Sequence, residues 1–312
     1  MKILHVDQNH PALIEGFEAL GHENIIAYKT PLADLTSALA IAEGIVIRSR
    51  FPITAAVLEQ CPKLKFIARL GAGLENIDTA TAEKKNIALL AAPEGNRNAV
   101  GEHSIGLLLA LMRKIPAGDQ SVKQGEWLRE AHRGWELLGR TVGIIGYGHM
   151  GKQLAKKLKG FDVKVLCYDI LPDVGDAHAQ QVPLAVLQQQ AEVISLHTPQ
   201  TPQTTGMINT QFIAAMHHPF WLINTARGSA VDTAALLEGI ATNKILGAGL
   251  DVLEFESKAF TEVVQQNKTA TLDALLKNDK VILSPHIGGW TYESHLRLAT
   301  VILKKFKAQF HS

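Results

Sequence analysis

The feature that most constrains this chain is a Gly-x-Gly-x-x-Gly motif near its middle, formed by Gly146, Gly148 and Gly151. The apolar run TVGII precedes it, and a helical pattern of apolar residues follows it. A second apolar run, VKVLCYD, then ends in Asp169. A strand, a glycine-rich turn, a helix and an acid-ended second strand are the context that a dinucleotide-binding unit requires. We therefore expect a bound dinucleotide; a plain glycine-rich turn in a βαβ unit is the alternative.

Each glycine of the motif has its own expected role. Gly146 permits the tight turn, Gly148 lets the backbone approach a pyrophosphate, and Gly151 lets the helix pack close to the strand. The pyrophosphate then meets backbone N–H groups and the positive end of the helix dipole.

Asp169 indicates which dinucleotide binds. A carboxylate at the end of the second strand can accept hydrogen bonds from the ribose hydroxyls of NAD and repels the 2′-phosphate of NADP. The following residues, ILPDVGDAHAQ, contain no arginine or lysine to compensate for that repulsion. The sequence therefore predicts NAD as the cofactor.

The charge and cysteine content exclude several classes of function. Lys plus Arg total 31 and Asp plus Glu total 30, which gives a net charge of +1 and no electrostatic signature for nucleic acid or an anionic membrane. The longest apolar run, IGLLLALM, is too short to span a bilayer. Cys61 and Cys167 belong to no metal-ligand cluster, so we expect reduced cysteines, no metal and a soluble, cytoplasmic protein.

The order of apolar runs predicts an α/β fold with two doubly wound parallel-sheet domains and a cleft between them. The first five runs suggest a flavodoxin-like substrate domain, and six later runs suggest a Rossmann-type cofactor domain. The expected strands lie in ILHV, NIIAY, GIVIRS, LKFIARL and IALLAAP, and then in TVGIIG, VKVLCYD, VISLHTP, FWLINTA, ILGAGLDV and KVILSPH.

Two longer helices set the expected domain boundaries. One helical segment covers about 99–115, and a final helix covers about 291–310. We expect residues 1–98 to form the substrate domain, completed by the C-terminal helix 290–312, and residues 99–289 to form the NAD-binding domain. The carboxyl ends of the strands are the expected ligand site.

Arg227, Glu256 and His286 follow three consecutive strands of the cofactor domain. In an open parallel sheet these ends face the same crevice, so an arginine, a carboxylate and a histidine can converge beside the nicotinamide. Taken singly, they could be a surface helix-cap partner, a solvated loop acid and a hydrogen-bonded strand-end residue.

Together the three residues fit one reaction. A guanidinium can hold a carboxylate with two parallel hydrogen bonds. Histidine titrates near neutrality and can exchange a proton with a hydroxyl or ketone, and a neighbouring glutamate favours its protonated form. This predicts oxidation of a 2-hydroxy acid, with His286 taking the hydroxyl proton, or reduction of a 2-keto acid in reverse.

Over essentially its full length the chain resembles the D-isomer-specific 2-hydroxyacid dehydrogenases. The resemblance rests on the central glycine motif and on AAPEGNRNAVGEHSIGLLLAL, SLHTPQTPQTTGMIN, INTARGSAVD, GAGLDVLEFE and SPHIGGW, in that order. It implies that Arg227 binds the substrate carboxylate, that His286 is the acid/base and that Glu256 is its partner.

The resemblance also implies residues around the two ligands. Gly71, Ala72 and Gly73 match a loop that offers N–H groups to the substrate carboxylate. The implied cofactor contacts, beyond Gly146, Gly148, Gly151 and Asp169, are His149, Met150, Thr198, Pro199, Thr225, Ala226, Asp251 and Gly288. The region 99–112 is used by the family in a two-fold dimer, so we expect a homodimer; its apolar face equally fits an intramolecular core helix.

Two departures from the family pattern stand out. Ser257 follows Glu256 where family members usually carry proline, and an extended, helical-looking segment occupies 257–279. Glu254 is a second candidate for the partner of His286, although the family register favours Glu256.

One further cluster points to a charged substrate. Arg48, Ser49 and Arg50 end a strand of the first domain, and two arginines flanking a serine can hold a dianion. The segment resembles that of 3-phosphoglycerate dehydrogenases, which implies the 3-phosphoglycerate and 3-phosphohydroxypyruvate pair of serine biosynthesis. An ordinary basic strand end is the alternative. Since the chain ends soon after its last helix, we expect no feedback through a regulatory extension.

Other substrates and one other class of function stay open. D-lactate, glyoxylate or hydroxypyruvate would suit the same catalytic residues, as would the tiny substrates of formate or phosphite dehydrogenases in the family. An NAD(H)-sensing binding protein or co-repressor would share the fold and the catalytic residues but would show no turnover.

Overall fold

The structure is a computed structural model, which describes residues 1–256 and 269–311. The described chain forms two compact units. The first contains residues 1–97 and 290–311, and the second contains residues 98–256 and 269–289. Ser257 and most of the helical-looking segment expected after Glu256 lie outside the described residues; α11, Ala270–Leu276, covers part of its end.

The first unit is built on a five-stranded parallel sheet in the order β2-β1-β3-β4-β5. This is the flavodoxin-like order, and each of the five apolar runs contains one strand, as predicted. The strands are β1 (Lys2–His5), β2 (Glu23–Ile26), β3 (Gly44–Ile47), β4 (Phe66–Arg69) and β5 (Ala88–Ala91).

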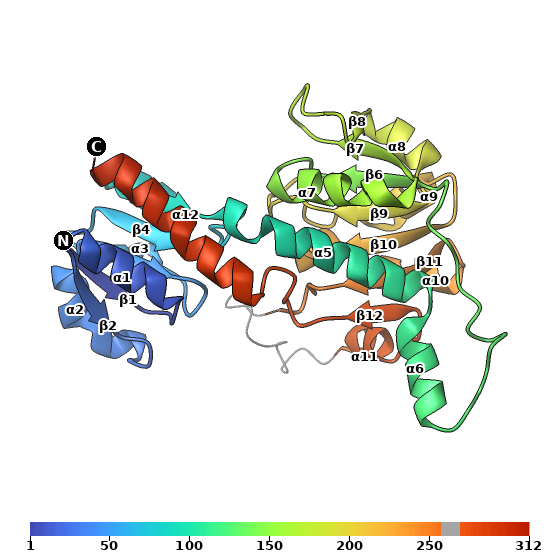
Figure 1. Ribbon diagram of the computed structural model, residues 1–312, viewed down its shortest axis with the longest axis horizontal. Coiled ribbons are helices and arrows are strands. Elements are labelled where there is room, and N and C mark those ends of the chain that lie inside the picture. Colours follow the sequence, from blue (N-terminus) through green and yellow to red (C-terminus); the bar gives the residue numbers. More distant parts are fainter. Residues whose placement is uncertain (257–268, 312) are drawn as a thin grey trace. The chain divides into compact units, whose positions relative to one another are not determined.

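The C-terminal helix α12, Tyr292–Phe310, completes the core of the first unit (Figure 1). It packs beside α1, Pro11–Ala19, and Gly16 makes room for the close approach of Leu303. Phe306 contacts Phe17 edge to face, with ring centroids 5.0 Å apart. The remaining helices of this unit are η1 (Leu32–Leu35), α2 (Thr36–Ile41), α3 (Ala55–Glu59) and α4 (Thr79–Lys84).

The second unit is built on a parallel sheet in the order β12-β11-β10-β9-β6-β7-β8. Counted from its first strand, this is the Rossmann order 3-2-1-4-5-6 with a further strand at one edge. The strands are β6 (Thr141–Ile145), β7 (Lys164–Tyr168), β8 (Gln180–Gln181), β9 (Val193–Leu196), β10 (Phe220–Asn224), β11 (Ile245–Leu250) and β12 (Val281–Leu283).

Strand β8 is a difference from the six strands expected for this sheet. It contains only two glutamines, which pair with Leu166 and Cys167 of β7. A two-residue polar strand has no apolar run or alternation, so the signal used for the other strands was missing.

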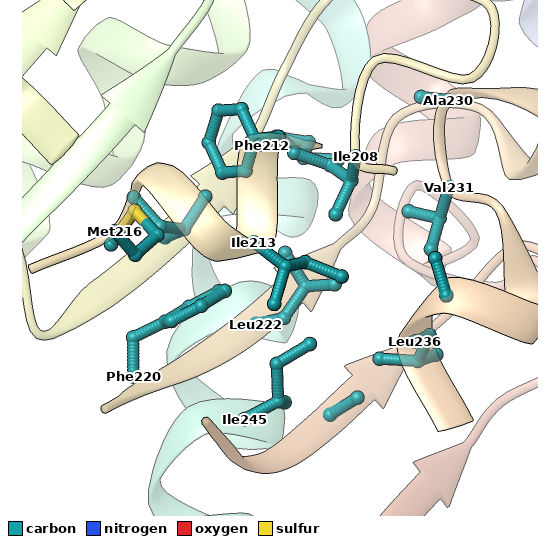
Figure 2. Close-up of a cluster of buried hydrophobic side chains, with 14 of the residues drawn as sticks. Ile208, Phe212, Ile213, Met216, Phe220, Leu222, Ala230, Val231, Leu236 and Ile245 are labelled. Atoms are coloured by element: carbon teal, nitrogen blue, oxygen red, sulfur yellow. The ribbon is translucent and has the colours of Figure 1, made fainter. Parts of the chain in front are cut away.

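Helices cover both faces of the second sheet, and their apolar side chains form its core. Figure 2 shows one part, where Phe212 and Ile213 of α9, Thr210–Ala215, pack near Leu222 and Phe220 of β10. Apart from α11 and the long helix described next, the other helices of this unit are α6 (Ile115–Lys123), α7 (His149–Leu158), η2 (Lys159–Phe161), α8 (Leu184–Gln190), η3 (Gly228–Ala230) and α10 (Thr233–Ala241). No helix in the described ranges combines the length and apolar character needed to cross a membrane.

Helix α5, Pro93–Met112, begins and ends earlier than the helix expected at 99–115. Its first turn contains Pro93, which suits the start of a helix because the missing N–H would have had no partner there. The helical conformation is then interrupted at Lys114, whose φ is +51°, before α6 begins at Ile115. The glycine and asparagines near the start of α5 had hidden its first turns from the sequence pattern.

The buried histidine His5 makes the stability of the first unit depend on pH. Burial lowers the pKa of His5 to about 4, partly opposed by its hydrogen bond to Asn24 Oδ1 at 2.7 Å. The unfolded chain binds a proton near pH 6.5, so stability is complete above that pH and falls as the pH drops towards 4. Between pH 7 and pH 5 this residue should cost about 2 kcal/mol of unfolding free energy.

Denaturant unfolding at pH 7 and pH 5 tests this prediction. The difference in unfolding free energy between the two pH values should shrink in His5→Gln and persist in His218→Gln, which changes an exposed histidine of the second unit. An unchanged pH dependence in His5→Gln would contradict the prediction.

Candidate active site

The turn between β6 and α7 has the backbone that its glycines predict. Gly146 has a φ of +89°, and a side chain there would also collide with His197. At Gly151 a Cβ would lie 2.2 Å from the carbonyl oxygen of Gly146, so only glycine allows α7 to pack this close to the turn. The strand, the turn and the helix are therefore held in the arrangement of a dinucleotide fingerprint.

The start of α7 suits a bound pyrophosphate. Gly148 is the N-cap residue, and a Cβ added there would meet no atom within 4 Å. No side chain of the described residues caps this helix. The first N–H groups of α7, from His149, Met150 and Gly151, therefore point out from a helix N-terminus without a competing protein side chain, which fits an anionic ligand.

Asp169 is fixed directly after β7. Its carboxylate accepts the N–H of Tyr147 at 2.7 Å and the N–H of Leu171 at 3.0 Å, one on each oxygen. Each carboxylate oxygen has a second lone pair, so two hydroxyl groups of a ribose could still donate to it. The residue is half-buried beside the turn that it helps to hold.

The other expected cofactor residues follow β9 and β10. Thr198 follows β9, and its hydroxyl is buried without a hydrogen-bond partner among the described residues. Thr225 follows β10 and shares a hydrogen bond with Ser104 of α5, with their oxygens 3.0 Å apart. Buried polar atoms usually have partners, so the Thr198 hydroxyl fits a site that a polar ligand completes.

Arg227 is presented by a loop that Asn224 organises at the end of β10. Asn224 is buried, donates from Nδ2 to the carbonyl of Arg227 at 2.9 Å and accepts the N–H of Ala226 at 3.0 Å. At Gly228 a Cβ would lie 2.0 Å from the backbone of Leu253. The arginine loop therefore packs directly against the loop that leads to Glu256.

Glu256 and His286 form a hydrogen-bonded pair. Glu256 Oε2 lies 2.8 Å from His286 Nδ1, and Glu256 Oε1 accepts the N–H of Leu253. Glu254 is exposed, and within the described residues its carboxylate forms no hydrogen bond or ion pair with His286. A carboxylate oxygen accepts, so Nδ1 carries the proton in this pair, and Nε2 is the nitrogen that can exchange a proton with a substrate oxygen.

Asp251 holds the backbone around His286. Its carboxylate accepts the N–H of Ile287 at 2.9 Å, the N–H of Gly288 at 2.8 Å and the hydroxyl of Ser284 at 2.6 Å. Burial raises the pKa of Asp251, but hydrogen bonds from His103, Ser284 and Gly288 outweigh it and leave the pKa below its ordinary value. Asp251 and Gly288 were both predicted from the sequence as cofactor residues. In the structure they are joined by the hydrogen bond from the Gly288 N–H to the Asp251 carboxylate.

In the first unit, Asp7 organises the segment that contains Arg48, Ser49 and Arg50. Its Oδ2 accepts the backbone N–H of all three, at 2.6, 3.1 and 3.3 Å. The Arg50 guanidinium donates to backbone carbonyls of Val6, Ala27 and Thr30. The Arg50 guanidinium therefore ties together three backbone segments of this unit, and its role as a phosphate ligand stays a prediction.

Arg48 has different surroundings. Its guanidinium lies over the ring of Trp290, 4.1 Å from the centroid, and donates no hydrogen bond to any of the described residues. The ring centroid of His295 lies 5.5 Å from that of Trp290 and 5.8 Å from that of His10. Its Nε2 is buried and has no hydrogen-bond partner within the described residues. Burial, then Arg48 and then His10 lower the pKa of His295. Arg48 and His295 therefore both lie against Trp290, and His10 lies against His295.

The loop of Gly71, Ala72 and Gly73 follows β4 in the same unit. Arg69 packs across it, and its Nη1 occupies the space that a side chain at Gly71 would need. Within the described residues, the N–H groups of Ala72 and Gly73 have no hydrogen-bond acceptor. Adjacent unpaired N–H groups of this kind can bind a carboxylate.

Several contributors were missed by the sequence reasoning. Asn224, Ser284 and His103 lie inside the segments that resemble the family, but they were given no role there, and His10 and His295 lie in no such segment. Their roles depend on partners distant in the chain. Asp7 was recognisable only as an acid at a strand end, the same signal that identified Asp169.

Comparison with known proteins decides the family. The family model for the NAD-binding domain of D-isomer-specific 2-hydroxyacid dehydrogenases matches residues 105–288. The chain belongs to the D-isomer-specific 2-hydroxyacid dehydrogenase family. It is thus an oxidoreductase with an NAD-binding domain, and NAD is its cofactor.

Individual relatives of this dehydrogenase differ in their substrates. Hydroxypyruvate reductase of Thermotoga maritima is 36% identical over 87% of this chain and 86% of its own length. D-3-phosphoglycerate dehydrogenase of Archaeoglobus fulgidus is 38% identical over 83% of this chain and 48% of its own length. The chain thus spans about half the length of the phosphoglycerate dehydrogenases that it matches.

A solved structure of the same family extends the likeness to both units. D-lactate dehydrogenase of Aquifex aeolicus, complexed with NAD and lactic acid, matches with a TM-score of 0.84 at 30% identity. The match covers 100% of this chain and 96% of that one. The family and the fold of two parallel-sheet α/β domains are therefore as the sequence predicted, and the substrate is not fixed by these likenesses.

We predict that Glu256→Gln lowers kcat by about 100-fold or more, because the amide N–H₂ group would face the Nδ1–H of His286 or require the other tautomer. Glu254→Gln, an exposed change two residues away, should stay within about twofold of the unchanged enzyme. Steady-state kinetics over pH 5–9 measure both. Loss of activity in Glu254→Gln with normal Glu256→Gln would reverse the assignment.

We also predict that kcat/KM is higher with NADH than with NADPH. Asp169→Asn should narrow that preference by about tenfold, because the negative charge facing a 2′-phosphate is removed. The two cofactors are compared at equal concentration with one 2-keto acid. Faster turnover with NADPH in the unchanged enzyme would overturn the role of Asp169.

Proposed function

We propose that this dehydrogenase interconverts 3-phosphoglycerate and 3-phosphohydroxypyruvate, which would make it an enzyme of serine biosynthesis. Arg48 is the observation that carries this proposal. A half-buried arginine without a hydrogen-bond acceptor among the described residues, stacked on Trp290 beside His10 and His295, is a site for a dianionic group. Arg48 stays charged although burial lowers its pKa.

The proposed roles in the second unit follow from the geometry of its strand ends. Arg227 binds the carboxylate next to the reacting carbon, for which a guanidinium offers two parallel donors. His286 gives a proton from Nε2 to the ketone oxygen during reduction, and takes it back during oxidation. Glu256 holds Nδ1 and stabilises the charge that His286 carries when doubly protonated. NADH, when bound, supplies the hydride.

The proposed cofactor contacts use the fixed turn after β6. The N–H groups at the start of α7 bind the pyrophosphate, and Asp169 binds the ribose hydroxyls. Thr198 offers its unpaired hydroxyl to the same ligand. In the first unit, the N–H groups of Ala72 and Gly73 offer donors that suit a carboxylate.

Hydroxypyruvate is the second candidate substrate. It differs from 3-phosphohydroxypyruvate only by the phosphate, so the catalytic residues would act in the same way. The observation that favours it is the likeness to the Thermotoga hydroxypyruvate reductase, which covers 86% of that protein rather than about half.

We further propose a cytoplasmic homodimer. The segment 115–138 exposes large apolar side chains that a monomer would leave in water. They are Ile115, Val122, Trp127, Leu128, Trp135 and Leu138, with Trp127 77% exposed. Two free buried cysteines, Cys61 and Cys167, fit a reducing compartment.

A panel of 2-keto acids tests the substrate. We predict the highest kcat/KM for 3-phosphohydroxypyruvate, and a loss of about 10- to 100-fold for that substrate in Arg48→Gln, because a charge-assisted hydrogen bond to phosphate is removed. Activity with hydroxypyruvate should change less than about threefold in the same variant. Lys63→Gln, an exposed change in the same unit, should leave both unchanged.

The other outcomes separate the alternatives. A higher kcat/KM for hydroxypyruvate, glyoxylate or pyruvate, with no selective effect of Arg48→Gln, would overturn the phosphorylated substrate. Tight NADH binding without turnover of any 2-keto acid would favour a nucleotide sensor.

A further inference from the structure

His103 of α5 lies at the start of a hydrogen-bond chain that ends at the His286 loop. Its Nε2 is 2.9 Å from Ser284 Oγ and 3.2 Å from Asp251 Oδ1. Ser284 directly follows β12 and lies two residues before His286. The side chain of His103 is 23% exposed, so this contact is shielded from most of the solvent.

The protons of this chain can be assigned from its chemistry. The lowered pKa of Asp251 leaves its carboxylate charged, and a carboxylate only accepts. Ser284 therefore donates its single hydroxyl proton to Asp251 Oδ1, at 2.6 Å. The hydroxyl oxygen can then only accept from His103, so Nε2 of His103 is the protonated nitrogen.

Asp251 also forms hydrogen bonds with the backbone of the loop that contains His286. Its carbonyl accepts the N–H of His286 at 2.8 Å, and its carboxylate accepts the N–H groups of Ile287 and Gly288. Three consecutive N–H groups are thus held by one residue. A Cβ at Gly288 would lie 2.8 Å from Asp251 Oδ2 and 3.2 Å from His103 Cδ2, so the loop fits closely against both.

This support matters because the backbone of His286 is strained. Its φ is +54°, in the left-handed region that residues other than glycine rarely adopt. Such a conformation persists only where the surroundings enforce it. It directs the imidazole to Glu256, with Nδ1 and Oε2 2.8 Å apart. Without the enforcing contacts, the backbone can relax and the imidazole loses its orientation.

We propose that His103 is a positioning residue for the reaction: through Ser284 and Asp251 it holds His286 in the strained backbone and single orientation that proton transfer needs. This rests on the proposed role of His286 as acid/base. His103 itself contacts neither substrate nor reacting atoms. Its donated proton is the property that matters, so a residue that restores the donor restores the function.

Two substitutions at position 103 separate the effect of the hydrogen-bond donor from the effect of side-chain packing. Leucine fills similar volume without a donor, whereas glutamine can place an amide N–H₂ close to the position of Nε2. His132→Leu is the matched control, because His132 Nε2 makes a similar contact with Ser121 Oγ at 3.0 Å in a segment away from the His286 loop. Ser284→Ala removes the next link and serves if His103→Leu does not fold.

The expected result is a loss confined to the chemical step. His103→Leu and Ser284→Ala should lower kcat by about tenfold or more, while the KM for NADH stays within about twofold. Their pH profiles of kcat/KM should shift, since the imidazole is no longer held against Glu256. His103→Gln should recover to within about threefold of the unchanged enzyme, and His132→Leu should match it.

Two kinetic results would overturn the proposal. One is His103→Leu with unchanged kcat and pH profile; the other is His103→Gln impaired as much as His103→Leu, which would leave only packing. Nitrogen-detected NMR of the His286 ring, without substrate, gives a reading independent of turnover. If no 2-keto acid reacts, the proposed function fails, whereas a His286 Nδ1–H signal unaltered by His103→Leu refutes the positioning role itself.

Discussion

The buried carboxylate of Asp251 joins segments of the second unit that are far apart in the sequence. It follows β11, receives hydrogen bonds from the loop after β12, and contacts His103 of α5. Its own backbone N–H donates to the carbonyl of Asn224, which in turn organises the arginine loop after β10. Arg227 and His286 are thus both held by residues linked through Asp251. Because three neighbouring parallel strands end here, this one carboxylate connects the loops that carry the side chains proposed for substrate binding and proton transfer.

The parallel sheets explain why the sequence predicted so much of this arrangement. Gly146 and Gly151 are required by the turn backbone and close packing, so they mark β6 and α7 without reference to the rest of the chain. Arg227, Glu256 and His286 could be predicted as a group because each follows an apolar strand and parallel strands end at one edge. Strand β8 and the early start of α5 escaped, since two glutamines and a proline-, glycine- and asparagine-rich turn give no apolar period.

Side-chain networks were the part that the sequence could not predict. The sequence alone does not distinguish Arg48 from Arg50. In the structure, Arg48 stacks on Trp290, whereas the Arg50 guanidinium donates hydrogen bonds to three backbone carbonyls. The two differ only in their tertiary partners, one near the last helix and the other near β1 and β2. His103 and Ser284 are likewise 181 residues apart, and their contact exists only after folding. Such contacts depend on the packing of distant elements, whereas strand ends and glycine turns are local.

The most direct test of the account follows the hydride itself. Enzyme, a 2-keto acid and NADH deuterated at both C4 positions are allowed to react, and the product is analysed by mass spectrometry and chiral chromatography. We expect a D-2-hydroxy acid with one deuterium at C2. A product without deuterium at C2, or the L-isomer, would contradict it.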